Sequence, residues 1–136
     1  MIRRLGPGDE ETLQALEDAY QRPIPLGPEV LADERSHILA AFEDERPVGY
    51  ALCYVLPRID GRTMIILYDI GVAEPFRRRG FGRELIEAAT ALMREAGAYK
   101  MFLLADEENE PAMGLYEATG GKREPDQVMW IWGTAD

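Results

Sequence analysis

An apolar strand meets an amphipathic helix in the stretch Asp69-Ile70-Gly71-Val72-Ala73-Glu74-Pro75-Phe76-Arg77-Arg78-Arg79-Gly80-Phe81-Gly82. The turn between them holds three arginines and two glycines. The first N–H groups of a helix have no partner inside the helix, and the helix dipole is positive at that end. Since glycine lets the backbone approach a ligand closely, a turn of this kind favours phosphate binding. We therefore expect an anion site here, positioned by the rest of the chain.

Three antiparallel strands are predicted before this turn. Ser36–Glu43 and Val48–Leu56 are rich in β-branched and aromatic residues, and the turn Asp44–Pro47 joins them as a hairpin. Asp60-Gly61 is a second turn signal, after which Thr63–Val72 follows as the third strand. A succession of strands joined by short turns indicates an antiparallel sheet.

The N-terminal part is predicted to add a strand and a helix. Ile2–Leu5 is a short candidate strand, and a helix begins near Asp9, its candidate N-cap. Three residues at helical spacing mark the buried face of this helix: Leu13, Leu16 and Tyr20. The prolines of Arg22–Pro28 exclude regular structure, and Pro28–Ala32 is a candidate short helix.

The C-terminal part is predicted to alternate helices and strands. An apolar stripe identifies the helix after the arginine turn: Leu85, Ile86, Ala89, Leu92 and Met93. Gly97 ends this helix, and Tyr99–Ala105 is a strand that a crossover returns parallel to the preceding one. A second helix is expected from about Asn109 to Thr119, and Val128–Trp132 is expected as the last strand.

These elements predict one domain, residues 1–136, of the α/β (α+β) class. Its sheet is expected to be mixed but mostly antiparallel, with about six strands and with helices flanking it. A chain of 136 residues, 46% of them hydrophobic, is sufficient for a single core.

Composition and charge exclude several classes of function. The formal net charge of −10 argues against nucleic acid as a partner. The only cysteine, Cys53, is expected to be a buried hydrophobe and the only histidine, His37, an ordinary strand residue, so no metal site is expected. No apolar run approaches the roughly twenty residues of a membrane span, and Met1–Asp9 lacks the apolar core of a signal peptide. We expect a soluble, cytoplasmic protein with no membrane partner.

Three ligand motifs compete for the arginine turn. A dinucleotide fold needs its glycine-rich turn early in the chain and an acidic residue about twenty positions later, and neither fits. A P-loop needs Lys and then Ser or Thr after its last glycine, but Gly82 is followed by Arg83-Glu84. The spacing that remains is Arg77-x-x-Gly80-x-Gly82.

This spacing resembles the pyrophosphate-binding motif of the GNAT superfamily of N-acetyltransferases, which bind acetyl-coenzyme A. Three residues follow it in the order that the family shows: Asn109, Tyr116 and Gly120. The resemblance covers Ile2 to Trp132. It implies that the turn and the first residues of the helix bind the coenzyme A phosphates, through Arg77, Arg78, Arg79, Gly80, Phe81, Gly82 and Arg83.

The resemblance narrows to the small aminoglycoside 3-N-acetyltransferases of the gentamicin-modifying type. Seven segments carry it: Ala40-Ala41-Phe42, Tyr54-Val55-Leu56-Pro57-Arg58, Tyr68-Asp69, Gly97-Ala98-Tyr99, Ala105-Asp106, Pro111-Ala112 and Leu115-Tyr116. The region between Tyr20 and Ser36 is shorter than in that group. Because this region lines the acceptor side in GNAT proteins, the departure bears on the choice of acceptor.

Asp69 interrupts an apolar strand, where a carboxylate is costly unless it is paired or lies in a cleft. It therefore meets a buried cationic partner or faces a ligand. Facing an amine acceptor, it would hold the ammonium group and accept its proton, directly or through water. The neutral amine could then attack a thioester.

Gly71 in the same strand indicates a bulge or a close backbone approach, and an ordinary kink would require the same glycine. The family resemblance implies a splayed strand end here. Main-chain groups of Ile70 and Val72 would then bind the pantetheine arm and polarise the acetyl carbonyl.

Two residues near the second helix have both a structural and a functional interpretation. The resemblance implies that Tyr116 protonates the leaving coenzyme A thiolate, for which a phenol of pKa about 10 is competent. A helix tyrosine that faces a core is, however, common. The resemblance implies that Asn109 contacts the coenzyme A arm, and Asn109 is equally a candidate N-cap of its helix.

The densest acidic patch follows the strand beside the expected acetyl site: Asp106, Glu107, Glu108 and Glu110. Four carboxylates there would favour a polyamine-like acceptor. A solvated loop that leads into a helix N-terminus explains them equally well.

The resulting hypothesis is an enzyme that transfers the acetyl group of acetyl-coenzyme A to an amine of an aminoglycoside. The resemblance to the gentamicin-modifying type implies that this amine is the 3-amino group. Attack would be direct, within a ternary complex. The alternatives are a polyamine, another small-molecule amine or a protein amine as acceptor, and a coenzyme A-binding sensor without catalysis. Trp130 and Trp132 could cover a partner, so a homodimer is a further hypothesis.

Overall fold

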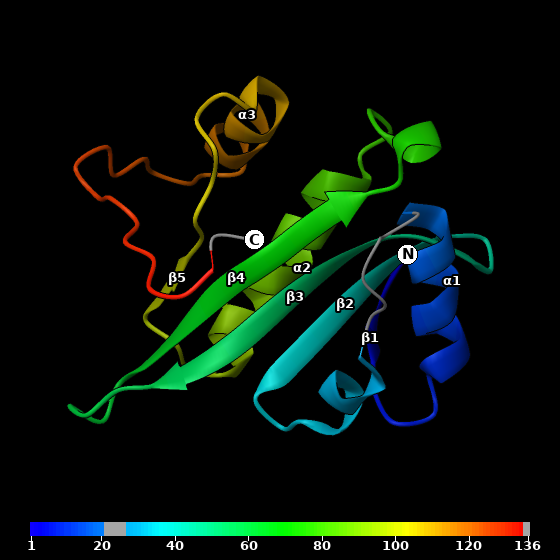
Figure 1. The fold of residues 1–136 in the computed structure, drawn as a ribbon, viewed down its shortest axis with the longest axis horizontal. Helices are drawn as coiled ribbons and strands as arrows, with labels where there is room; N and C mark the ends of the chain where they lie inside the picture. The colour runs from blue at the N-terminus through cyan, green and yellow to red at the C-terminus, as the bar shows by residue number, and fades with distance from the viewer. Residues whose placement is uncertain (21–26, 135–136) are drawn as a thin grey trace.

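The computed structural model describes residues 1–20 and 27–134 (Figure 1). Most of the expected loop Arg22–Pro28 lies outside the described residues. The elements follow in the order β1 (Ile2–Leu5), α1 (Glu10–Tyr20), η1 (Pro28–Ala32), β2 (Ser36–Glu43), β3 (Arg46–Pro57), β4 (Thr63–Val72), η2 (Glu74–Phe76), α2 (Phe81–Glu95), β5 (Lys100–Phe102) and α3 (Glu110–Ala118).

The strands form one mixed sheet in the order β1-β2-β3-β4-β5. The first three pairs are antiparallel, and β5 lies parallel to β4 after the crossover through α2. The α/β class and the mostly antiparallel sheet are thus confirmed. The parallel ladder is short, because it ends at Ile66 and Phe102 while β4 continues to Val72. Beyond that point the chain after β5 leaves β4 and leads to α3, as Figure 1 shows.

Helices cover both faces of the sheet. The apolar stripe of α2 packs on one face, where Leu85, Ala89, Cys53 and Ile65 are fully buried. Completely burying one leucine of this stripe stabilises the fold by roughly 1.5–3 kcal/mol. Helix α1 and η1 pack on the other face, around the fully buried Leu16. Alternate residues of the central strands therefore serve two cores.

Two features expected of single residues are confirmed. Cys53 is buried, and burial raises the pKa of its thiol to about 12, so it is an inert core residue at neutral pH. Gly97 ends α2 with φ 67°, and the N–H of Ala98 reaches back to the carbonyl of Met93 at 3.0 Å. Across the described ranges, 1–20 and 27–134, no helix has the length and apolar character of a bilayer span.

Two strand predictions were wrong. In the part of the chain that the structure describes, the sheet has five strands, not about six, because Val128–Trp132 forms no ladder and its residues are 58% to 87% exposed. A strand needs a neighbour to bond with, and β-propensity alone does not supply one. The strand expected over Tyr99–Ala105 is also shorter, Lys100–Phe102, since the chain beyond Phe102 leaves β4.

Candidate active site

A bulge in β4 sets the direction of Asp69. Leu52 pairs with Asp69, but the next residue of β3, Cys53, pairs with Leu67, so Tyr68 is the extra residue. Leu67 is buried in the α2 core, and strict alternation would place Asp69 on the same face. The bulge reverses the phase and brings Asp69 to the α1 face instead. The bulge therefore lies at Tyr68 and not at Gly71, and of the two interpretations of Gly71 the close approach is the one observed.

Gly71 allows the side chain of Tyr20 to approach the backbone of β4 closely. A Cβ at this position would lie 3.2 Å from the hydroxyl oxygen of Tyr20 and 3.3 Å from its ring. Tyr20 ends α1, so Gly71 lets the end of that helix pack against β4.

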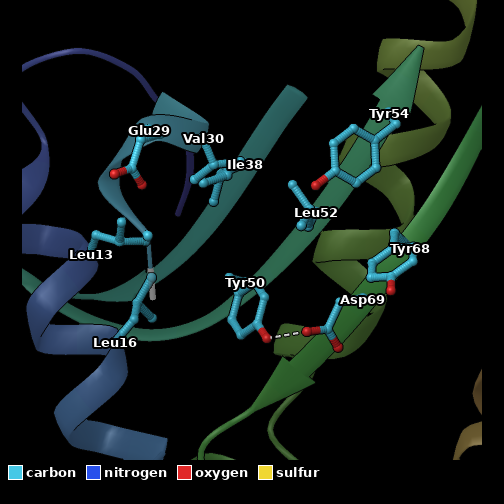
Figure 2. Close-up of a pocket in the computed structure, with 11 residues that line it drawn as sticks. Leu13, Leu16, Glu29, Val30, Ile38, Tyr50, Leu52, Tyr54, Tyr68 and Asp69 are labelled. Atoms are coloured by element: carbon cyan, nitrogen blue, oxygen red, sulfur yellow. Dashed lines mark hydrogen bonds between the residues drawn. The ribbon is translucent and has the colours of Figure 1, made fainter. Parts of the chain in front are cut away.

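A pocket of about 370 Å³ opens on the α1 face of the sheet (Figure 2). Its walls come from α1, η1 and strands β2 to β4, and they are mostly leucine, isoleucine, valine and tyrosine. Two carboxylates line it, those of Glu29 and Asp69, and they lie on different sides of it in Figure 2. We call it the acceptor pocket; its lining residues are Leu13, Leu16, Gly27, Glu29, Val30, Ile38, Tyr50, Leu52, Tyr54, Tyr68 and Asp69.

A second pocket of about 160 Å³ lies where β4 and the chain after β5 diverge. We call it the strand-gap pocket; it is lined by Leu67, Tyr68, Asp69, Ile70, Leu103, Leu104, Ala105, Asp106, Asn109, Ala112 and Tyr116. Tyr68 and Asp69 line both pockets. The bulged residue and its neighbour thus lie where the two pockets meet.

Asp69 is half-buried and accepts a hydrogen bond from the hydroxyl of Tyr50, drawn as a dashed line in Figure 2. The sequence left open a cationic partner or a ligand; among the described residues, one partner is the phenol of Tyr50 on β3. Because Asp69 also lines both pockets, it is accessible to a ligand as well as anchored by the sheet.

Tyr116 of α3 is half-buried in the wall of the strand-gap pocket. Burial raises the pKa of its phenol, and the charge of Asp69 raises this pKa further. The phenol is therefore protonated at neutral pH and is a proton donor. The structure brings Asp69 and Tyr116 to one site, from elements that are far apart in the sequence.

The arginine turn has the backbone of an anion site. Arg78 and Gly80 have positive φ, 64° and 88°, and Gly80 is the N-cap of α2 without a side-chain hydrogen bond to the helix. The first N–H groups of α2 thus lack the side-chain cap that Asn109 gives to α3, where its Oδ1 accepts from the N–H of Ala112 at 3.3 Å. These groups could hold the phosphates of coenzyme A.

The arginine side chains connect the turn to neighbouring elements. Arg77 donates from Nε to the carbonyl of Val72 at 3.0 Å, Arg79 pairs with Glu43, and Arg83 pairs with Glu87 at 3.7 Å. Within the described part of the chain Arg78 has no hydrogen bond or ion pair. Gly82 faces α3, since a Cβ there would lie 3.0 Å from the side chain of Leu115. It therefore lets α3 approach α2 beside Tyr116.

Only one residue of the acidic patch lines a pocket. Asp106 lines the strand-gap pocket, and its carboxylate accepts the N–H of Glu108 at 2.9 Å. Glu107 pairs with Arg123, while Glu108 and Glu110 are exposed and line neither pocket. The patch is mainly a solvated loop, with one member at the site.

Four polar residues that line the acceptor pocket were not predicted from the sequence. Tyr50 and Tyr54 alternate with Leu52 along β3, and this period of two was a usable signal for one shared face. Tyr68 is the bulged residue, and Glu29 reaches the pocket from η1. No local pattern marks either of these, because both depend on how distant segments pack.

Comparison with known proteins identifies the family. A family model described as the acetyltransferase (GNAT) family matches residues 7–121. A mycothiol acetyltransferase of Corynebacterium aurimucosum is 36% identical over 64 residues, which are 47% of this chain and 21% of that protein. The chain thus spans about a fifth of that relative's length.

Solved structures resemble the whole chain. An aminoglycoside acetyltransferase from an uncultured soil metagenomic sample is 29% identical, with a TM-score of 0.81 over 99% of this chain and 98% of the other. A second one, in complex with sisomicin, is 24% identical, with a TM-score of 0.83 over 100% and 96% of the two chains, a likeness of fold. Given the family match over most of its length, this chain belongs to the acetyltransferase (GNAT) family, whose members take the acetyl group from acetyl-coenzyme A.

Proposed function

We propose that this acetyltransferase moves the acetyl group of acetyl-coenzyme A to an amine of an aminoglycoside, with the 3-amino group as the first candidate. One observation carries the proposal. Asp69 lines both the acceptor pocket and the strand-gap pocket, so a carboxylate stands where an amine from one side would meet a thioester from the other. The aminoglycoside acetyltransferases among the structural neighbours support this acceptor class.

Coenzyme A would extend from the arginine turn along the open edge of β4. The uncapped N–H groups of α2 and the side chain of Arg78 would receive its phosphates, and Phe81, Gly82 and Arg83 follow in the first turn of the helix. Residues of β4 beyond Ile66 have no ladder partner in β5, so their main-chain groups on that edge can bond the pantetheine arm. Ile70 and Val72 are the candidates, with Asn109 at the opposite wall.

The chemistry would be a direct transfer. The amine nitrogen attacks the acetyl carbonyl carbon, a C–N bond forms, and the C–S bond breaks. One proton of the ammonium group passes to Asp69, directly or through water, before the attack, and Tyr116 gives its phenolic proton to the departing thiolate. The nitrogen loses its second proton as the C–S bond breaks, and this proton restores the Tyr116 phenol, directly or through water. Tyr116 suits this step, because its pKa is raised and it remains above the ordinary pKa of a thiol, about 8.5. Cys53 is buried in the α2 core and takes no part.

A second acceptor class is favoured by the lining of the acceptor pocket. Leucine, isoleucine, valine and tyrosine side chains outnumber the two carboxylates, which suits an amine that carries an apolar body. The relative named as a mycothiol acetyltransferase is consistent with acceptors other than aminoglycosides.

The test is an acetyl-transfer screen over aminoglycosides, polyamines, apolar monoamines and peptides, monitored by thiol release. We expect turnover with gentamicin, and a loss of about 10²- to 10⁴-fold in kcat for Tyr116→Phe and for Asp69→Asn. Tyr99→Phe, an exposed tyrosine outside both pockets, is the matched control with wild-type kcat.

Two results would overturn the proposal. If both variants acetylate gentamicin at the wild-type rate, the assigned roles are wrong. If acetyl-coenzyme A raises the melting temperature but no amine gives turnover, the chain is a coenzyme A sensor rather than an enzyme.

A further inference from the structure

Tyr50 is a polar residue of the acceptor pocket that the proposed chemistry does not use. It lies on β3 opposite Gly71, and its neighbour two residues on, Leu52, lies opposite Asp69. Tyr50 and Asp69 are thus diagonal neighbours on the α1 face of an antiparallel pair. The ring of Tyr50 is only 7% exposed, and its hydroxyl donates to Oδ2 of Asp69.

The ring of Tyr50 is itself held by α1. Tyr20 meets it edge to face, with ring centroids 5.4 Å apart and planes at 83°. Tyr20 can take this place because Gly71 has no side chain; a Cβ there would lie 3.2 Å from the Tyr20 hydroxyl oxygen. The last residue of α1 therefore packs against the side chain that contacts the carboxylate.

We propose that Tyr50 is a positioning residue, which holds the Asp69 carboxylate at the junction of the two pockets. Its hydroxyl supplies a hydrogen bond to the group that accepts the proton of the amine. Tyr20 and Gly71 fix the Tyr50 ring, so the geometry of Asp69 depends on the packing of α1 against β4. The catalytic side of this inference rests on the proposed function, whereas the positioning itself does not.

The groups that face Asp69 define what a Tyr50 variant would change. In the described residues these are the phenols of Tyr50 from β3 and Tyr116 from α3, and the carboxylate of Glu29 across the acceptor pocket. The Tyr50 hydroxyl points to Asp69 in Figure 2, while Glu29 lies on another side of the pocket, so loss of this hydroxyl acts first on Asp69.

The deciding variant is Tyr50→Phe, which keeps the ring and its contact with Tyr20. We expect kcat to fall by about tenfold, because the carboxylate loses the hydrogen bond that fixes its position. The KM for acetyl-coenzyme A stays unchanged. Tyr99→Phe, outside both pockets, is the matched control with wild-type kcat.

Gly71→Ala tests the link to α1. It displaces Tyr20 without touching Asp69, so it should lower kcat as Tyr50→Phe does. A Tyr50→Phe protein whose kcat equals that of the wild type overturns the proposal. Should the wild type give no turnover with any amine, the proposed function fails, and crystal structures decide the positioning. The Asp69 carboxylate then changes place in Tyr50→Phe if the inference is right, and keeps it if the inference is wrong.

Discussion

The charge of Asp69 on β4 acts on the phenol of Tyr116 on α3. Burial is the larger cause of the raised pKa of Tyr116, and the Asp69 carboxylate is the second. The two residues reach the strand-gap pocket from elements that η2, α2 and β5 separate in the chain. The carboxylate proposed to accept a proton and the phenol proposed to donate one are therefore electrostatically coupled.

This coupling predicts an effect of Asp69→Asn on Tyr116. Removing the negative charge lowers the pKa of the phenol, although burial still holds it above the ordinary value. The measurement is the ultraviolet absorbance of tyrosinate against pH, taken as the difference between each protein and its Tyr116→Phe partner. An unchanged midpoint would show that the two groups are not coupled.

Gly80→Ala should weaken both the fold and the anion site. Gly80 has φ 88° and ψ 0°, a left-handed conformation that costs an alanine about 1 kcal/mol. We expect the free energy of unfolding in urea to fall by about that amount, and the affinity for acetyl-coenzyme A to fall with it. Gly114→Ala is the matched control, since Gly114 lies within α3 with open space at its Cβ. That variant should gain about 0.5–1 kcal/mol in free energy of unfolding. Equal effects of the two substitutions would contradict a special role for the left-handed conformation of Gly80.

Glu29→Gln should alter the choice of acceptor. Glu29 is the second carboxylate of the acceptor pocket, so its loss should raise the KM for an acceptor with several ammonium groups by several-fold. Neither kcat nor the KM for an apolar monoamine should change. Glu34→Gln, an exposed residue outside the pocket, serves as the control. A KM change that is the same for both amines would remove Glu29 from the recognition of a second charge.

His37 should make stability depend on pH. Burial, and next the charge of Arg4, lower the pKa of His37 in the folded protein below its ordinary value of about 6.5. The unfolded chain then binds more protons between these two pKa values, so stability is complete above about pH 6.5 and falls as the pH drops through that window. The free energy of unfolding in urea, plotted against pH, should fall less in this window for His37→Gln than for the wild type. Parallel curves would contradict the assignment of this pH dependence to His37.

The exposed C-terminal segment supports the hypothesis of a homodimer. Trp130 and Trp132 are 76% and 87% exposed, and exposed apolar clusters of this kind mark contact surfaces. We expect sedimentation equilibrium to give a dimer that Trp130→Glu dissociates. Ile59→Glu, at a fully exposed site on the β3–β4 turn, should leave the dimer intact. A wild-type monomer at all concentrations would reject the hypothesis.

The sequence by itself determined the order of the elements, the antiparallel strands and the arginine turn at the start of α2. These follow from local signals: period-two and helical patterns, turn residues, and the glycine that ends α2 at Gly97. It also identified Asp69 and Tyr116 as candidates, because a carboxylate in an apolar strand is conspicuous and because the family motif includes a helix tyrosine.

Only the tertiary structure decided how these residues meet. The bulge at Tyr68, which turns Asp69 away from the α2 core, is a property of the register between β3 and β4, and register depends on both strands together. The Tyr50 hydrogen bond, the room that Gly71 leaves for Tyr20, and the failure of Val128–Trp132 to pair are likewise set by distant neighbours. Local propensity fixes conformation along a chain, whereas a site is made by packing across it.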